Sequence, residues 1–142
     1  MTDQQSPGVL FVCVKNSGKS QMAAALMRQL AGDSVAVFSA GTHPGTGLNA
    51  QSAESLTEVG ASVAGEQPKP VTAELLAQVR LVVLVGSEVT LETPGVEQER
   101  WLTDEPSARG IEGMARMRLI REDIASRVIK LYHSRFSNRQ ER

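Results

Sequence analysis

One stretch of the chain decides the fold: residues 9–20, which read Val9-Leu10-Phe11-Val12-Cys13-Val14-Lys15-Asn16-Ser17-Gly18-Lys19-Ser20. Its first six residues form a continuous apolar run, which is typical of a parallel strand buried on both faces. A polar turn follows, and then Met22, Leu26 and Leu30 recur at helical spacing. The pattern predicts a buried strand, a polar loop and a helix over residues 20–31.

The rest of the chain continues this alternation of strands and helices. Apolar runs predict strands over residues 35–38, 81–85 and 100–102, and helical spacing predicts helices over 49–59, 72–79 and 114–131. Without repeats or linkers, the alternation predicts an α/β fold: a three-layer sandwich in which helices flank a four-stranded parallel open sheet. We expect a single catalytic domain over residues 8–133, a flexible N-terminus at 1–7 and a polar C-terminal tail at 134–142.

Composition narrows the class of function. The chain has 142 residues and a formal net charge of -1, which argues against a nucleic-acid partner because binding many phosphates needs a basic face. Its apolar runs are too short to span a membrane and none resembles a signal peptide, so we expect a cytoplasmic protein. A single cysteine excludes an internal disulfide, a Cys-rich zinc site and a built-in dithiol pair.

The loop after the first strand carries the predicted chemistry. In open parallel sheets, ligands bind beyond the carboxyl ends of the strands, where this loop lies. Its backbone N–H groups and the positive end of the following helix favour an anion. We therefore predict that an oxyanion binds at Val14, Lys15, Asn16, Ser17, Gly18 and Lys19. The same donors stabilise a thiolate at Cys13, which makes it a nucleophile.

Each residue type in the loop has a physical reason. Asn16 tolerates left-handed backbone, and Gly18 permits a positive φ or a close approach of the backbone. Lys19 supplies a cation, and Ser20 is expected both to donate a hydrogen bond to the thiolate and to cap the helix. A lone cysteine after an apolar strand is more often a buried core residue, but a polar, lysine-rich turn is not required for that role.

A nucleotide- or phosphate-binding module is an alternative, because Gly18-Lys19-Ser20 also ends the phosphate loop of nucleotide-binding proteins. In that motif the first glycine would stand at position 13, where Cys13 would obstruct the phosphates. The strand over residues 81–85 also ends in Gly86 rather than in an aspartate that would hold Mg²⁺. These two departures favour the thiolate interpretation.

At this point the chain resembles a known family, the low-molecular-weight protein tyrosine phosphatases and the arsenate reductases that share their fold. The similarity lies in residues 9–20, in Ser39-Ala40-Gly41-Thr42 and in Glu105-Pro106. The single-cysteine arsenate-mycothiol transferases are the most similar subgroup, through Gly18-Lys19-Ser20-Gln21-Met22-Ala23-Ala24-Ala25-Leu26. The resemblance implies an arsenate reductase of the thiol-transferase type, with a role in arsenical resistance.

The resemblance also implies a mechanism and its partners. Cys13 attacks arsenate, and Glu105 or Asp104 acts as general acid, with Glu105 favoured because it directly precedes Pro106. A low-molecular-weight thiol then takes the arsenic: the resemblance implies mycothiol, although chemistry alone would accept glutathione. A glutaredoxin-like mycoredoxin completes reduction to arsenite. No bound cofactor or metal is expected, and Lys69, in the turn Pro68-Lys69-Pro70, is expected to stabilise the thiolate or bind the thiol substrate.

Three features of the chain depart from the phosphatases and the thioredoxin-coupled reductases that it resembles. Phosphatases of this fold have an arginine in place of Lys19, and a point charge poorly replaces a planar fork that binds two oxygens. They also have aromatic residues where Ser107-Ala108 follow Pro106 here. Thioredoxin-coupled reductases resolve the arsenic adduct with two further cysteines, and residues 86–96 contain none. The first two departures count against a tyrosine or aryl phosphatase, which is the principal alternative. We place His43 and His133 on the surface and Trp101 in the core.

Overall fold

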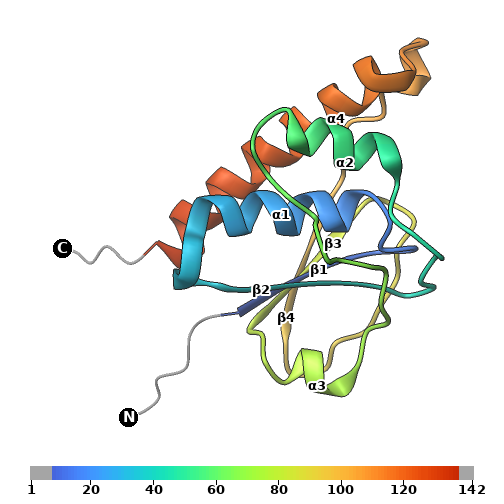
Figure 1. Cartoon of the computed structure of the whole chain (residues 1–142). Helices are drawn as coiled ribbons and strands as arrows, with labels where there is room; N and C mark the ends of the chain where they lie inside the picture. Colours follow the sequence, from blue (N-terminus) through green and yellow to red (C-terminus); the bar gives the residue numbers. More distant parts are fainter. Residues whose placement is uncertain (1–7, 138–142) are drawn as a thin grey trace.

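A computed structural model describes residues 8–137 and shows a single four-stranded sheet in the order β2-β1-β3-β4 (Figure 1). The strands are β1 (Gly8–Cys13), β2 (Ala36–Gly41), β3 (Leu81–Val85) and β4 (Glu97–Trp101), and every neighbouring pair is parallel. β1 is central, between β2 and β3. This explains why its sequence is apolar at every position from Val9 to Val12.

Helices cover both faces of the sheet, as predicted. The larger layer contains α1 (Lys19–Ala31), α2 (Ala50–Thr57) and α4 (Gly113–Leu131), and the short α3 (Ala73–Leu76) lies on the opposite face (Figure 1). Three short helices complete the fold: η1 (Gly32–Ser34), η2 (Pro106–Arg109) and η3 (Tyr132–Phe136). Thr72 caps α3 as its residue type predicts, because its side chain accepts a hydrogen bond from the backbone N–H of Leu75.

Alternate residues of the buried strands divide the core into two clusters. Val9 and Phe11 face α1 and α4, where the ring of Phe11 lies 5.6 Å from that of Trp101. Leu10 and Val12 face the opposite side, with Val79, Val82, Leu84 and Val89. This alternation fixes the strand register, because a slip of one residue would exchange the two faces. Trp101 is a core residue, as predicted.

Two apolar residues of the predicted helices are exposed rather than buried. Leu30 is 39% exposed, because the buried face of the last turns of α1 passes through Met27 and Ala31 instead. Val59 is 38% exposed, because α2 ends at Thr57 and helical spacing no longer applies there. The spacing of apolar residues correctly predicted the helices, but it did not predict which face of each helix would pack against the sheet.

Several element boundaries also differ from the prediction. α3 ends at Leu76 rather than near residue 79, and β2 continues to Gly41. The strand expected over residues 100–102 runs from Glu97 to Trp101; it is an edge strand, and its exposed side chains are polar. The tail expected from Ser134 instead begins as the helix η3, and Phe136 is buried with the Arg80 guanidinium 5.1 Å from its ring centre. The predictions for 1–7 and 138–142 lie outside the described residues. Between residues 8 and 137, no helix is both long and apolar enough to cross a membrane.

Candidate active site

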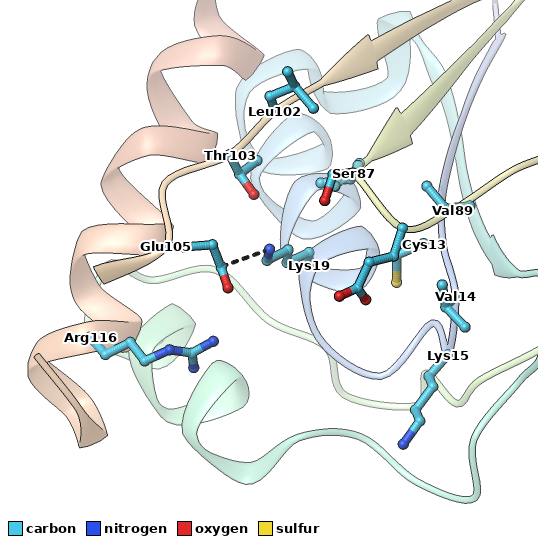
Figure 2. Close-up of a pocket in the computed structure, with 13 residues that line it drawn as sticks. Cys13, Val14, Lys15, Lys19, Ser87, Val89, Leu102, Thr103, Glu105 and Arg116 are labelled. Atoms are coloured by element: carbon cyan, nitrogen blue, oxygen red, sulfur yellow. Dashed lines mark hydrogen bonds and ion pairs between the residues drawn. The ribbon is translucent and has the colours of Figure 1, made fainter. Parts of the chain in front are cut away.

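The candidate site lies at the carboxyl ends of the strands. Cys13 is the last residue of β1 and pairs with Gly41, the last residue of β2. A cleft of about 380 Å³ opens at this edge, with Cys13 in its wall (Figure 2). Its lining residues are Cys13, Val14, Lys15, Lys19, Val85, Gly86, Ser87, Glu88, Val89, Leu102, Thr103, Glu105 and Arg116. The sulfur therefore belongs to a cleft rather than to the apolar interior.

Two polar groups contact the sulfur of Cys13. The backbone N–H of Asn16 donates to Sγ at 3.2 Å, and the hydroxyl of Ser20 lies 3.0 Å from it. The side chain is partly exposed, so a substrate in the cleft can reach it. Hydrogen bonds of this kind stabilise a thiolate more than a thiol, because the anion is the better acceptor.

A buried network of amides orients the Ser20 hydroxyl. The Asn16 side-chain oxygen accepts hydrogen bonds from the Gln21 amide and the Lys69 backbone N–H, each at 3.1 Å. These two donors fix the orientation of the Asn16 amide, so its NH₂ group faces Ser20 and donates to the hydroxyl oxygen at 2.7 Å. Since that oxygen already accepts a hydrogen bond, the single hydroxyl proton of Ser20 is left for the sulfur of Cys13.

The backbone carbonyl groups of the loop accept hydrogen bonds from neighbouring segments of the chain. The segment after β2 donates four backbone hydrogen bonds to them: Thr42 to Cys13, His43 to Val14, Gly45 to Lys15 and Asn49 to Ser17, at 2.7–3.2 Å. The Asn16 carbonyl accepts from the Gln21 side chain, and the Gly18 carbonyl accepts from the N–H of Met22. Every carbonyl from 13 to 18 thus has a donor.

The N–H groups of the loop are arranged differently from its carbonyls. Among the residues that the structure describes, the backbone N–H groups of Lys15, Ser17 and Gly18 donate to no protein acceptor. They sit just before the first turn of α1, whose own N–H groups carry the positive end of the helix dipole. The loop therefore leaves N–H donors unused at the place where the sequence predicts an oxyanion, and the oxyanion site itself stays a prediction.

Gly41 is required beside the loop. A Cβ atom at this position would lie 2.7 Å from the Val14 carbonyl oxygen and 3.0 Å from the backbone nitrogen of Asn16. Asn16 itself has a φ of 56°, the left-handed conformation expected of its residue type. Gly18, in contrast, has a φ of −135°, so Asn16 makes the left-handed turn. Of the two reasons predicted for Gly18, a close approach is the one that applies, because a Cβ there would lie 3.4 Å from Oγ of Ser52.

Ser20 has one of its two predicted roles. It contacts the sulfur, but it does not cap α1: the helix begins at Lys19, its cap residue is Gly18, and no side chain bonds to the first turn. The physical reason is that the Ser20 hydroxyl is already engaged by Asn16 and Cys13. The orphan N–H groups of the first turn consequently remain available to a ligand.

Lys19 and Glu105 face each other across the cleft. The Lys19 Nζ lies 3.0 Å from Oε2 of Glu105, and Figure 2 shows the lysine side chain extending toward that carboxylate. Helix α4 holds the segment before Glu105: Arg127 donates to the Leu102 carbonyl and Asp123 accepts from the Asp104 N–H. Glu105 therefore belongs to the cleft that contains Cys13.

Asp104 occupies a different position, outside the residues that line the cleft. Its two oxygens accept hydrogen bonds from Arg109 at 2.8 and 3.2 Å. The Arg109 guanidinium lowers the pKa of Asp104 below its ordinary value. A carboxyl group that is held ionised in this way is a poor proton donor at neutral pH.

Lys69 reaches the site through its backbone. Its N–H donates to Asn16, its carbonyl accepts from the N–H of Gly41 at 2.8 Å, and its side chain lies 3.5 Å from Glu66. The ammonium group is absent from the cleft lining. The backbone of the turn at residues 68–70 thus supports residues 13–20, which we call the nucleophile loop. The Lys69 ammonium group is paired with the carboxylate of Glu66 instead.

Arg116 is a residue that sequence reasoning missed. It projects from α4 toward the cleft (Figure 2), and within residues 8–137 its guanidinium has no hydrogen bond or ion pair. It also lines a smaller cavity beside Gly18 and Lys19. No motif marks this residue, because it lies almost one hundred positions after Lys19 in a helix with several arginines.

The remaining candidates lie away from the cleft. His43 and His133 are exposed, as predicted. Among residues 8–137, no group of three or more His, Cys, Asp or Glu side chains is arranged to hold a metal ion.

Known proteins are similar to this chain in sequence and in fold. The profile of the family described as low molecular weight phosphotyrosine protein phosphatase matches residues 8–138. A putative arsenate reductase of Halobacterium salinarum is 32% identical over 128 residues, which cover 86% of this chain and 88% of that protein.

Two solved structures are similar. One is a thioredoxin-dependent arsenate reductase of Corynebacterium glutamicum, with a TM-score of 0.77 and 33% identity; the match covers 94% of this chain but only 63% of that protein's length. The other is an arsenate reductase in the phosphate binding state, with a TM-score of 0.79, 25% identity, and coverage of 92% and 99%. The chain belongs to the low molecular weight phosphotyrosine protein phosphatase family.

Proposed function

We propose that this protein is an arsenate reductase of the thiol-transferase type, in which the Cys13 thiolate attacks arsenate bound by residues 14–19. One observation carries the proposal: the sulfur of Cys13 accepts hydrogen bonds at the edge of a loop whose remaining N–H donors are unused. Arsenate reductases of this fold support the choice of oxyanion, and one of them was solved in a phosphate binding state.

The first step joins sulfur to arsenic. The thiolate of Cys13 attacks the arsenic of arsenate, a sulfur–arsenic bond forms and an arsenic–oxygen bond breaks. A general acid gives the departing oxygen a proton, so that it leaves as water. Glu105 is our candidate for that acid, because it lines the cleft with Cys13 and Asp104 does not. Arsenic keeps its oxidation state in this step.

The second step needs a thiol from outside the chain. Relatives named as thioredoxin-dependent use a different reductant, but Cys13 is the single cysteine here and Ser87 lies in the cleft wall after β3. The cleft volume of about 380 Å³ is larger than a tetrahedral ion requires and falls in the range that holds small organic ligands, roughly 300–1,000 Å³. A low-molecular-weight thiol can therefore enter beside the arsenic adduct.

Thiol transfer then regenerates the enzyme. The small thiol attacks arsenic, its sulfur–arsenic bond forms, and the bond to Cys13 breaks, which returns the thiolate. A separate dithiol protein attacks the thiol sulfur of the released adduct; the electron pair of that sulfur–arsenic bond stays with arsenic, which leaves as arsenite. We propose mycothiol as the small thiol and a glutaredoxin-like mycoredoxin as the dithiol protein, both acting in the cytoplasm.

Two cations are candidates for contacts with the small thiol. Arg116 lines the outer part of the cleft without a partner among the described residues, so its five N–H donors are free for polar groups of a co-substrate. Lys69 is the second, and its role would require its side chain to leave Glu66. Arg116 is the stronger candidate because it already lines the cleft.

An aryl phosphatase is the second candidate function, because the family profile carries that name. One assay separates the two. We expect reductant to be consumed when the protein is incubated with arsenate, mycothiol and a coupled mycoredoxin. Omission of mycothiol or of mycoredoxin should stop the reaction. Hydrolysis of an aryl phosphate without thiol-dependent arsenate turnover would support the phosphatase. Full arsenate turnover by a Cys13→Ser variant would contradict the assignment of the nucleophile.

A further inference from the structure

The ammonium group of Lys19 is directed at Glu105 rather than at the sulfur of Cys13. Lys19 Nζ lies 3.0 Å from Oε2 of Glu105, and its side chain extends across the cleft rather than toward Cys13 (Figure 2). Both residues are partly open to solvent, with side-chain exposures of 26% for Lys19 and 52% for Glu105. An ion pair of this kind is weak, so another anion can compete for the ammonium.

The loop offers that competitor a place close by. Lys19 is the first residue of α1 and directly follows Ser17 and Gly18, whose N–H groups donate to no described acceptor. An oxyanion on these donors carries up to two negative charges, whereas Glu105 carries one. Coulomb attraction therefore favours transfer of the ammonium from the carboxylate to the ion.

We propose that a bound oxyanion replaces Glu105 as the counter-ion of Lys19, which releases the Glu105 carboxylate from the ion pair. This inference rests on the proposed oxyanion site but not on thiol transfer. The exchange therefore couples occupancy of the oxyanion site to the position of the Glu105 side chain in the cleft.

The neighbouring ion pair shows why a lysine suits this exchange. Arg109 binds both oxygens of Asp104 through its planar fork, a geometry that resists exchange. Lys19 makes a single contact through a flexible four-carbon stem, and an ammonium group keeps its interaction when it rotates. The chain thus places a fixed pair and an exchangeable pair at adjacent residues, 104 and 105.

Titration with inorganic phosphate tests the exchange without any arsenic chemistry. Glu105→Gln removes the competing charge with little change of shape, so we expect phosphate to bind about two- to fivefold more tightly than to the wild type. Lys19→Met should weaken phosphate binding. In the Lys19→Met background, Glu105→Gln should change the affinity by less than about 1.5-fold, because no ammonium is left to exchange.

Glu88→Gln is the matched control, because Glu88 also lines the cleft but forms no ion pair with Lys19. If Glu88→Gln raised phosphate affinity as much as Glu105→Gln, removal of any negative charge from the cleft would explain the gain. That result would overturn the proposed exchange. The same conclusion follows if the gain with Glu105→Gln persists without Lys19. Failure of phosphate to bind the wild type would instead reject the oxyanion site itself.

Discussion

The side-chain amide of Asn16 donates to the hydroxyl oxygen of Ser20 at 2.7 Å, and that hydroxyl lies 3.0 Å from the sulfur of Cys13. Both Asn16 and Ser20 are fully buried. The amide therefore acts on the sulfur indirectly, by occupying the acceptor oxygen of Ser20 so that its proton points at Cys13.

Asn16→Asp tests this relay with almost no change of shape. A carboxylate cannot donate to Ser20, and it attracts the hydroxyl proton away from the sulfur. We expect alkylation of Cys13 by iodoacetamide at pH 7 to slow by about tenfold or more. Asn49→Asp is the control: Asn49 caps α2 by accepting from the Ser52 N–H, which a carboxylate also does. Equal rates for wild type and Asn16→Asp would contradict the relay.

Substitution of the two adjacent acids should separate their roles. Glu105→Gln should lower kcat for arsenate by about 10²-fold, because it removes the candidate proton donor. Asp104→Asn should lower the thermal midpoint slightly, through loss of the Arg109 pair, and leave kcat within about a factor of two. Steady-state kinetics of both variants gives the answer. The reverse pattern would assign the acid to Asp104.

Lys19→Arg tests the departure from the phosphatases. A guanidinium binds two oxygens of a phosphoryl group at once, which an ammonium cannot do. We expect the variant to hydrolyse p-nitrophenyl phosphate faster than the wild type. Unchanged hydrolysis would mean that Lys19 is not what limits phosphatase activity, and that the missing aromatic residues near Ser107 matter more.

Gly41→Ala tests the fit between β2 and the nucleophile loop. The new Cβ would lie 2.7 Å from the Val14 carbonyl, so the loop must shift. We expect the free energy of unfolding to fall by about 1–3 kcal/mol and Cys13 reactivity to fall with it. Gly47→Ala, where a Cβ has no neighbour within 4 Å, is the control for the same change in the same segment. Similar denaturation curves for the two variants would contradict the prediction.

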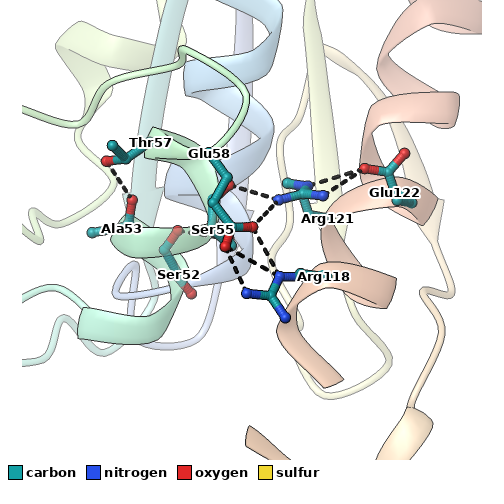
Figure 3. A network of polar contacts seen from close by, with 8 residues as sticks. All are labelled: Ser52, Ala53, Ser55, Thr57, Glu58, Arg118, Arg121 and Glu122. Carbon is teal, nitrogen blue, oxygen red and sulfur yellow. Dashed lines mark hydrogen bonds and ion pairs between the residues drawn. The ribbon is translucent and has the colours of Figure 1, made fainter. Parts of the chain in front are cut away.

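Glu58 joins α2 to α4 and predicts a pH dependence of stability. It accepts hydrogen bonds from Arg118 and Arg121, which lower its pKa from 4.5 to about 2 (Figure 3). Because the folded-state pKa is depressed, the contribution of Glu58 is complete above pH 4.5 and is lost as pH falls toward 2. Thermal midpoints of wild type and Glu58→Gln should differ at pH 7 and converge between pH 4.5 and 2.

Glu54→Gln is the control for that measurement. Glu54 lies one turn earlier, on α2, and forms no salt bridge within residues 8–137. Its substitution should give a smaller difference at pH 7. A constant gap between wild type and Glu58→Gln across the whole pH range would contradict the linkage.

Sequence patterns predicted the parts of the fold that depend on local order. The apolar run at 9–14 and the spacing along 114–131 identified β1 and α4, because burial on both faces and on one helix stripe leave distinct patterns. β4 was placed less well, since an edge strand with polar exposed side chains leaves no such pattern. Leu30 was misplaced because spacing alone does not say where the sheet lies.

The sequence predicted those parts of the site whose residues are close together in the chain. Cys13, Asn16 and Ser20 lie within eight residues, and their side chains form hydrogen bonds with one another. The ion pair of Lys19 with Glu105 joins residues 86 positions apart, and Arg116 enters from α4. Both depend on how α4 packs against α1, which no short motif encodes.

The hydrogen bonds from residues 42–49 to the carbonyls of the nucleophile loop have a consequence for how the enzyme meets its substrate. The ring of donors is assembled when the protein folds, so we expect an incoming oxyanion to move the Lys19 side chain while the backbone stays in place. Association should then be limited by diffusion and desolvation rather than by a slow rearrangement of the main chain.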